Sequence, residues 1–360
     1  MFFTLALSST LIAPAPGFVL SLADRVGRCA PIYTVRNSPS EPPQNISVST
    51  DGSTIAYVEH VAPPRCGYDR IVVLRSSVRE ILRSPLPEMC AGCSNPGEMY
   101  DIARLRVFND QTILATVDLH FSGAYSGIKR TTFFWDRSVW SRLKSYVSAR
   151  RRFPDNQSLA DGASRRRFAV NFDWDDDFSA FQAFVSKESG DAPIAAIVDH
   201  DVVHWLGRGT VTSVACNAAV GYEDEYAHHG TIRAIRWTGS KRADLGAGVA
   251  FDCDGDFTVG DDRSRWFDSG QPVMWNRGVK TKLLNELGSA FGIRGDIVVG
   301  SANHKGFILR SDERHHFVNV PTNLKLSSIF AITTGGRMLA LQDRGTLPTA
   351  LLSIGPIAMK

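Results

Sequence analysis

Short runs of alternating apolar and polar residues fill the chain, and each run ends at glycine, proline, asparagine or aspartate. A clear example is the segment 290–320, which reads AFGIRGDIVVG, then KGFILRS, then HHFVNV. Alternation with a period of two is typical of half-buried strands, and Gly295 between two such runs predicts a hairpin turn. Equivalent turns are predicted near Gly52, Asp110, Asp176, Asn217, Gly255, Gly295 and Gly336.

The turns recur with a period typical of repeat proteins. The last five are 38 to 41 residues apart, close to the ~40–45 residues of a four-stranded propeller blade. A third β-prone segment follows each turn: Ile71–Leu74, Thr131–Trp135, Ile194–Val198, Ile232–Trp237, Pro272–Trp275, Phe307–Leu309 and Thr349–Ile354. The sequence therefore predicts an all-β fold, a seven-bladed β-propeller of four-stranded antiparallel blades. Residues 31–360 would form this single domain, with loop insertions near residues 82–97 and 149–167.

The last unit has one strand too few, because Pro356 interrupts the residues after its third segment. The segment Ile32–Val35 is strongly β-prone and lies before the first unit. We therefore expect Ile32–Val35 to pair with Ala350–Leu352 and close the ring, because an unpaired edge would invite aggregation.

Residues 1–30 begin with an apolar stretch that has no charged residue before Asp24. This favours an export signal, against an apolar tail, and places the protein in the extracellular space or periplasm. Pro14 and Pro16 interrupt the run, so no integral membrane span is expected. Six cysteines would suit disulfides in an exported chain, and the sequence leaves their pairing open. For Cys90 and Cys93 a disulfide within a loop is favoured over half of a zinc site. For Cys216 and Cys253 buried free thiols are favoured. The six are Cys29, Cys66, Cys90, Cys93, Cys216 and Cys253.

A nearly balanced charge gives no case for a nucleic-acid partner, since the formal net charge is +3. Arg150–Arg152 and Arg165–Arg167 form two basic triplets, but they lack interleaved aromatic residues and favour a solvated loop. We expect a monomer that presents its loops to a protein or glycan partner.

Two acidic clusters are the candidate calcium ligands. One contains Asp173, Asp175, Asp176 and Asp177, and the other contains Asp252, Asp254 and Asp256. Alternating carboxylates beside a glycine can hold Ca²⁺, but the later acidic ligand of an EF-hand loop is missing. Aspartate and glycine are also what a hairpin turn requires, and this reading is favoured, so no cofactor or metal is assigned.

No nucleophile elbow, zinc-protease helix or phosphate loop occurs in the sequence. The pairs His228–His229 and His315–His316 lack a third metal ligand, as do His200 and His204. A glycan hydrolase or lyase would have to draw on Asp173, Asp175, His200 and Asp201 as converging acids and bases. A non-catalytic binding or structural module is the favoured hypothesis, and no catalytic residue is assigned.

The segments 248–283 and 290–320 resemble bacterial extracellular repeats of the HAF type. The matching residues are Ala290, Gly292, Ile293, Gly295, Ile297, Val298 and Gly300, then Gly306 and Phe307, then Val320 and Pro321. The neighbouring unit keeps Ala250, Gly255, Val259, Gly260 and Trp275. The resemblance covers residues 211–354 and implies an exported β-propeller, without implying an activity. Integrin-like calcium repeats are the alternative suggested by Asp252–Asp256.

Overall fold

A computed structural model of the 360-residue chain consists of strands, turns and loops, with no helix among the described residues. The described residues are 20–21, 43, 46–61, 68–75, 78–82, 98–108, 111–121, 127–136, 139–142, 167–172, 194–199, 202–215, 218–224, 230–239, 241–265, 267–311, 325–342 and 350–354. None of them belongs to a helix of sufficient length and apolarity to span a bilayer.

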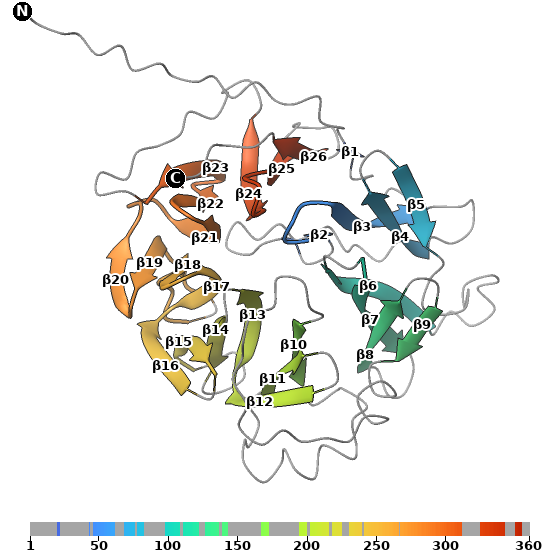
Figure 1. The fold of residues 1–360 in the computed structure, drawn as a ribbon, viewed down its shortest axis with the longest axis horizontal. Coiled ribbons are helices and arrows are strands. Elements are labelled where there is room, and N and C mark those ends of the chain that lie inside the picture. Colours follow the sequence, from blue (N-terminus) through green and yellow to red (C-terminus); the bar gives the residue numbers. More distant parts are fainter. Residues whose placement is uncertain are drawn as a thin grey trace, which may run out of the picture.

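The described strands form seven antiparallel sheets arranged as a ring (Figure 1). The first sheet contains β2 (Ile46–Val48), β3 (Thr54–Val61), β4 (Tyr68–Arg75) and β5 (Val78–Leu82). The second contains β6 (Glu98–Val107), β7 (Ile113–Phe121), β8 (Gly127–Asp136) and β9 (Val139–Arg142). The third contains β10 (Arg167–Phe172), β11 (Ile194–Asp199) and β12 (Val202–Arg208). Strands within each of these three sheets follow chain order.

The later sheets are more regular. The fourth contains β13 (Thr210–Ala215), β14 (Ala218–Asp224), β15 (Ile232–Thr238) and β16 (Lys241–Ala247). The fifth contains β17 (Val249–Asp254), β18 (Phe257–Asp261), β19 (Pro272–Asn276) and β20 (Val279–Lys282). The sixth contains β21 (Gly288–Arg294), β22 (Ile297–Ala302) and β23 (Lys305–Arg310). The seventh contains β24 (Leu326–Ile332), β25 (Met338–Gln342), β26 (Ala350–Ile354) and β1 (Leu20–Ser21).

Four of the seven predicted hairpin turns are described, and all four lie between the first two strands of a sheet. They are Gly52, Gly255, Gly295 and Gly336, each with a positive φ. Asp110 and Asn217 lie outside the described residues but fall between β6 and β7 and between β13 and β14. Four predicted turns therefore match the structure, and the turn predicted near Asp176 lies outside the described residues.

The third sheet has three described strands, β10, β11 and β12. One residue, Gly209, joins β12 to β13, just as Gly248 joins the outermost strand β16 to β17. β12 is therefore equivalent in position to β16, the outermost strand of the fourth sheet. Asp176, near which a turn was predicted, lies outside the described residues.

Apolar clusters fill the seams between neighbouring sheets. One cluster joins the first sheet to the second, and others join each consecutive pair from the third to the seventh. Trp237 and Trp275, almost fully buried, belong to the seams before the fourth and fifth sheets respectively. Each sheet is thus stabilised by the burial of one apolar face against its neighbour, as in repeat architectures.

The ring closes differently from the sequence expectation. The strand beside β26 is β1, in which Leu20 pairs with Leu351 and Ser21 with Ala350. The prediction that Ile32–Val35 closes the ring was wrong, because residues of the apolar N-terminal stretch occupy that edge of the seventh sheet. Ile32–Val35 itself lies outside the described residues.

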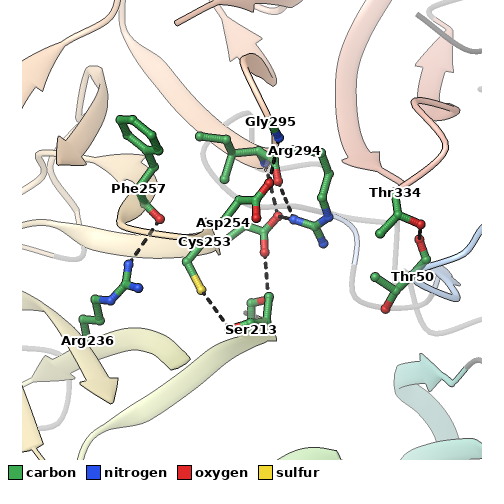
Figure 2. Close-up of polar contacts among 12 residues, drawn as sticks. Thr50, Ser213, Arg236, Cys253, Asp254, Phe257, Arg294, Gly295 and Thr334 are labelled. Carbon is green, nitrogen blue, oxygen red and sulfur yellow. Dashed lines mark hydrogen bonds and ion pairs between the residues drawn. The ribbon is translucent and has the colours of Figure 1, made fainter. Parts of the chain in front are cut away.

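Side chains also bridge the first and last sheets. Tyr57 and Leu74 of the first sheet share an apolar cluster with Leu339 and Leu341 of the seventh. At the adjacent hairpin tips, Thr334 donates its backbone N–H and its hydroxyl to the carbonyl oxygen of Thr50, at 2.9 and 3.2 Å. Figure 2 shows this contact. Closure therefore combines strand pairing with a packed seam.

The same cluster reaches the centre of the ring. It contains Phe251, Phe291 and Phe330 from the innermost strands β17, β21 and β24, together with Ile46 of β2. Phe251 and Phe291 lie edge to face, with ring centroids 5.4 Å apart. Each phenylalanine is skipped by a register shift in its strand pairing. These bulges place large apolar side chains near the axis on this side of the ring.

The outer edges carry exposed and mostly charged side chains. All four residues of β20, Val279, Lys280, Thr281 and Lys282, are exposed. Lys241 and Arg242 are likewise exposed on β16, the outermost strand of the fourth sheet. Lysine and arginine on an edge strand oppose pairing with another chain.

Candidate functional site

The antiparallel strand order gives the ring two chemically different faces. The innermost strand of each sheet begins at one face of the ring. The connections between second and third strands lie on the same face, and residues 262–271, between β18 and β19, are such a connection. We call this the loop face. The turns between first and second strands, such as Gly255 and Gly295, lie on the other face, the tip face.

Asp252 is the centre of a buried network on the tip side. It lies on β17 and accepts hydrogen bonds from Ser213 Oγ of β13, at 2.9 Å, and from the backbone N–H of Ile293, at 3.2 Å. Arg294 Nη1 of β21 is 2.6 Å from Asp252 Oδ2, the oxygen that also accepts from Ile293, and forms an ion pair with it. One carboxylate thus links the innermost strands of three consecutive sheets. A buried ion pair needs such additional hydrogen bonds to offset desolvation.

The other two aspartates of this candidate calcium cluster, Asp254 and Asp256, have different partners. Asp254 accepts a hydrogen bond from the backbone N–H of Gly295 at 2.7 Å (Figure 2). Asp256 forms an exposed ion pair with Arg277, at 2.7 Å. Across the described part of the chain, no three histidine, cysteine, aspartate or glutamate residues are grouped so that they could hold a metal ion. The three carboxylates on this turn therefore serve separate structural contacts.

Two further contacts join the fourth and fifth sheets beside this network (Figure 2). The Cys253 thiol is buried and donates to the carbonyl oxygen of Ala215 at 3.5 Å. Arg236 donates to the carbonyl oxygen of Phe257 and to Thr258 Oγ1, at 3.2 and 2.8 Å. The buried thiol agrees with the expectation for Cys253; the other five cysteines lie outside the described residues.

On the loop face, a buried ion pair anchors the connection Asp262–Gln271. Asp261 has no exposed surface and accepts hydrogen bonds from Arg263 Nε at 2.8 Å and from Ser289 Oγ at 2.7 Å. The guanidinium of Arg263 also lies 6.0 Å from the ring centroid of Phe251, within cation–π range. The base of this connection is therefore tied to both the fifth and the sixth sheet.

The middle of the same connection is presented to solvent. Phe267 is 84% exposed, and Leu287 on the neighbouring link between β20 and β21 is 56% exposed. Asn303 and His304 lie in the turn between β22 and β23, and Lys325 directly precedes β24. All three adopt positive φ although they are not glycine. Such backbone conformations cost about 1 kcal/mol or more each and concentrate at functional surfaces. The sequence analysis missed Phe267, since an isolated aromatic residue carries no periodic signal.

Two carboxyl groups have shifted acidity. Burial raises the pKa of Asp51, but hydrogen bonds from Ser49 and Ser53 outweigh that effect and hold it below its ordinary value of 3.8. Burial likewise raises the pKa of Asp244, and it is lowered overall by Arg233, by the N–H of Gly246 and by Arg242. Both groups therefore favour the ionised form in the folded protein.

Most of the residues considered as acids, bases or metal ligands lie outside the described residues. These are Asp173, Asp175, Asp176, Asp177, His200, Asp201, His228, His229, His315 and His316. His204 is described and pairs with Ile197 in the register of β12 and β11. Within the described residues, the structure brings together Asp252 with Arg294 and Asp261 with Arg263.

Comparisons with known proteins address the fold. No family model matches the sequence, and no curated protein matches it. The structure is similar to the β-propeller domain of the Trilobed protease from Pyrococcus furiosus, with TM-score 0.51 and 11% identity, over 86% of this chain and 94% of that chain. The description of that structure reports an open velcro topology.

Two lower-scoring similarities are to enzymes. A puromycin-hydrolysing peptidase of Mycobacterium tuberculosis gives TM-score 0.33 and 11% identity, over 83% of this chain and 58% of that chain. A Trypanosoma rangeli sialidase in complex with the inhibitor DANA gives 0.36 and 8%, over 86% and 54%. Identities this low carry no residue role across. The ring of antiparallel sheets and the first similarity together define an all-β protein with a β-propeller fold.

Proposed function

We propose that this chain is a β-propeller binding module that engages a protein or glycan partner through its loop face. The observation that supports this most is the difference between the two faces. On the tip face Asp252, Asp254 and Asp256 all have protein partners. On the loop face a rigidly anchored connection presents the exposed Phe267. A binding site on loops held by a rigid scaffold is a common use of such folds.

The proposal includes seven blades of four strands each. In the third sheet the innermost strand is the one without a described counterpart, and residues 143–166 precede β10 in the sequence. In the sixth sheet the outermost strand would fall within residues 312–324, which include the β-prone segment HHFVNV. Both positions lie outside the described residues and have enough length for a strand of five or six residues.

An exported monomer of the extracellular space or periplasm remains part of the proposal, supported by the apolar N-terminal stretch. The HAF-type resemblance of residues 211–354 agrees with that location. The alternative is a propeller hydrolase or lyase, for which Asp173, Asp175, His200 and Asp201 are the available acids and bases. In the sequence, Asp173 and Asp175 lie between β10 and β11, and His200 and Asp201 lie between β11 and β12.

The test is a comparison of binding with turnover. The purified chain is applied to glycan and peptide arrays, and in parallel to fluorogenic glycosides and peptides. We expect saturable binding to one class of ligand without turnover. Turnover that is lost in Asp173→Asn or Asp175→Asn, while the fold is retained by circular dichroism, would establish the enzyme alternative instead.

A further inference from the structure

Loops of three consecutive sheets form one continuous surface on the loop face. We call it the loop platform and define it as residues 262–265, 267–271, 282–288, 302–305 and 325. Gly288 donates its N–H to Gly270 O at 2.9 Å, and Asn303 donates to Leu287 O at 2.8 Å. Ser301 Oγ donates to Ser327 O at 2.9 Å and joins the sixth sheet to the seventh. Backbone and side-chain hydrogen bonds therefore hold the segments in fixed relative positions.

The platform displays two large apolar side chains. Phe267 and Leu287 are two of the five large hydrophobic residues that are exposed within the described part of the chain. They belong to adjacent segments, since Gln271 and Asn285 are hydrogen-bonded and Gly270 accepts from Gly288. Burying an exposed aromatic side chain of this kind is typical of interaction hot spots.

The charged groups of the platform are mainly cationic. Arg265, Lys282, Lys305 and Lys325 are exposed, against the exposed anions Asp268 and Glu286. Lys282 donates to Gln271 Oε1 at 2.6 Å and so keeps its ammonium at this surface. The half-buried carboxylate of Asp262 accepts from the N–H of Gln271 and holds the ends of the connection together. The exposed excess of positive charge favours an anionic partner.

We propose that the loop platform binds an acidic, extended segment of a partner protein that also carries apolar side chains. This rests on the proposed binding function and specifies its surface and partner. The apolar side chains of the partner would cover Phe267 and Leu287, and its carboxylates would lie beside Arg265, Lys282, Lys305 and Lys325. A neutral glycan could stack on Phe267 but would leave the cations without a counterpart, so a peptide fits better.

The experiment uses a randomised peptide library displayed on phage, selected against the full chain. Enriched peptides are synthesised with a fluorescent label and measured by anisotropy. We expect them to combine aspartate or glutamate with leucine or aromatic residues. Binding should weaken at least about tenfold in Phe267→Ala/Leu287→Ala, in line with loss of a hot-spot contact. It should also weaken as salt rises, since the attraction is partly electrostatic.

Val279→Ala is the matched control, because Val279 is also an exposed apolar residue, at 69%, but lies on β20 next to the turn on the tip face. Peptides that bind equally to Phe267→Ala/Leu287→Ala would overturn the platform proposal and leave the binding function standing. Heparin is the test of charge attraction. If heparin binds as tightly as the peptides, and equally to the wild type and to Phe267→Ala/Leu287→Ala, charge attraction alone accounts for the binding. Absence of any selected peptide, with turnover of a substrate, would overturn both proposals.

Discussion

The indole N–H of Trp275 donates a hydrogen bond to the carbonyl oxygen of Leu245, at 2.9 Å. Trp275 is on the third strand of the fifth sheet, and Leu245 is on the outermost strand of the fourth. Trp237 makes the equivalent bond to Leu206 one sheet earlier, at 3.1 Å. Each tryptophan therefore ties its sheet to the preceding one by a bond in addition to apolar packing.

We expect Trp275→Phe to destabilise the protein by about 2–4 kcal/mol, from a smaller buried ring and an unsatisfied carbonyl group. The free energy of unfolding is measured by urea denaturation. Trp237→Phe should lower the free energy of unfolding by a similar amount, because Trp237 makes the equivalent hydrogen bond to Leu206. A loss below about 0.5 kcal/mol, as at ordinary surface positions, would contradict the role of this bond.

Removing the Asp252 carboxylate should also be costly. Asp252→Ala leaves the Arg294 guanidinium without its buried counter-charge, and we expect a loss of about 3–5 kcal/mol. A double-mutant cycle with Arg294→Met measures the coupling between the two side chains. The double variant should recover part of the stability lost in the single Asp252 variant.

The exposed pair Arg277–Asp256 provides the control, with side chains 80% and 55% exposed. Asp256→Ala should change the free energy of unfolding by less than about 1 kcal/mol, since solvent screens the pair. If Asp252→Ala and Asp256→Ala lower the free energy of unfolding equally, the buried ion pair contributes no more to stability than the exposed one.

Glycine at position 260 is required by space rather than by backbone conformation. A Cβ there would lie 1.9 Å from the carbonyl oxygen of Val249 on the paired strand. We expect Gly260→Ala to lower stability by about 3 kcal/mol or more, the upper range for overpacking against backbone. Gly255→Ala is the comparison, because a Cβ there meets nothing within 4 Å and only the positive φ opposes it. Its cost should be about 1–2 kcal/mol.

Stability should fall in acid partly through Asp51 and Asp244. Both have a pKa below 3.8 in the folded protein, so each contributes stability above that pH and loses it as the pH falls through the folded value. Thermal unfolding between pH 7 and pH 2.5 measures this. The variant Asp51→Asn/Asp244→Asn should have a lower Tm than the wild type at pH 7. The difference should shrink as the pH falls below 3.8, and a constant difference would contradict the linkage.

The alternation of apolar residues was sufficient to predict the β-propeller class. Gly52, Gly255, Gly295 and Gly336 mark turns because a tight hairpin needs a positive φ, and that demand is visible locally. The turn predicted near Asp176 lies outside the described residues. The predicted closing strand was wrong, because Ile32–Val35 and the N-terminal apolar stretch are both β-prone and only tertiary pairing distinguishes them.

The candidate site was much harder to predict than the fold. For Asp252, Asp254 and Asp256 the sequence favoured a hairpin turn over a calcium site. Their partners could not be predicted, because Arg294 is on β21, Gly295 is in the turn after β21, and Arg277 is in the turn after β19. Asp252 and Arg294 are 42 residues apart, so no local pattern announces their pairing. The buried pair Asp261 and Arg263 is local in sequence, but its burial depends on Ser289 and Phe251 from neighbouring strands.

The exposed β20 edge, with Lys280 and Lys282, has a consequence for the protein at high concentration. A second molecule could extend the fifth sheet only by aligning its own charged edge against these ammonium groups, which repel each other and would lose water on contact. Concentrated solutions should therefore resist fibril growth from this edge. Acetylation of the two lysines would remove that protection while leaving the hydrogen-bonding groups of the strand available to a neighbour.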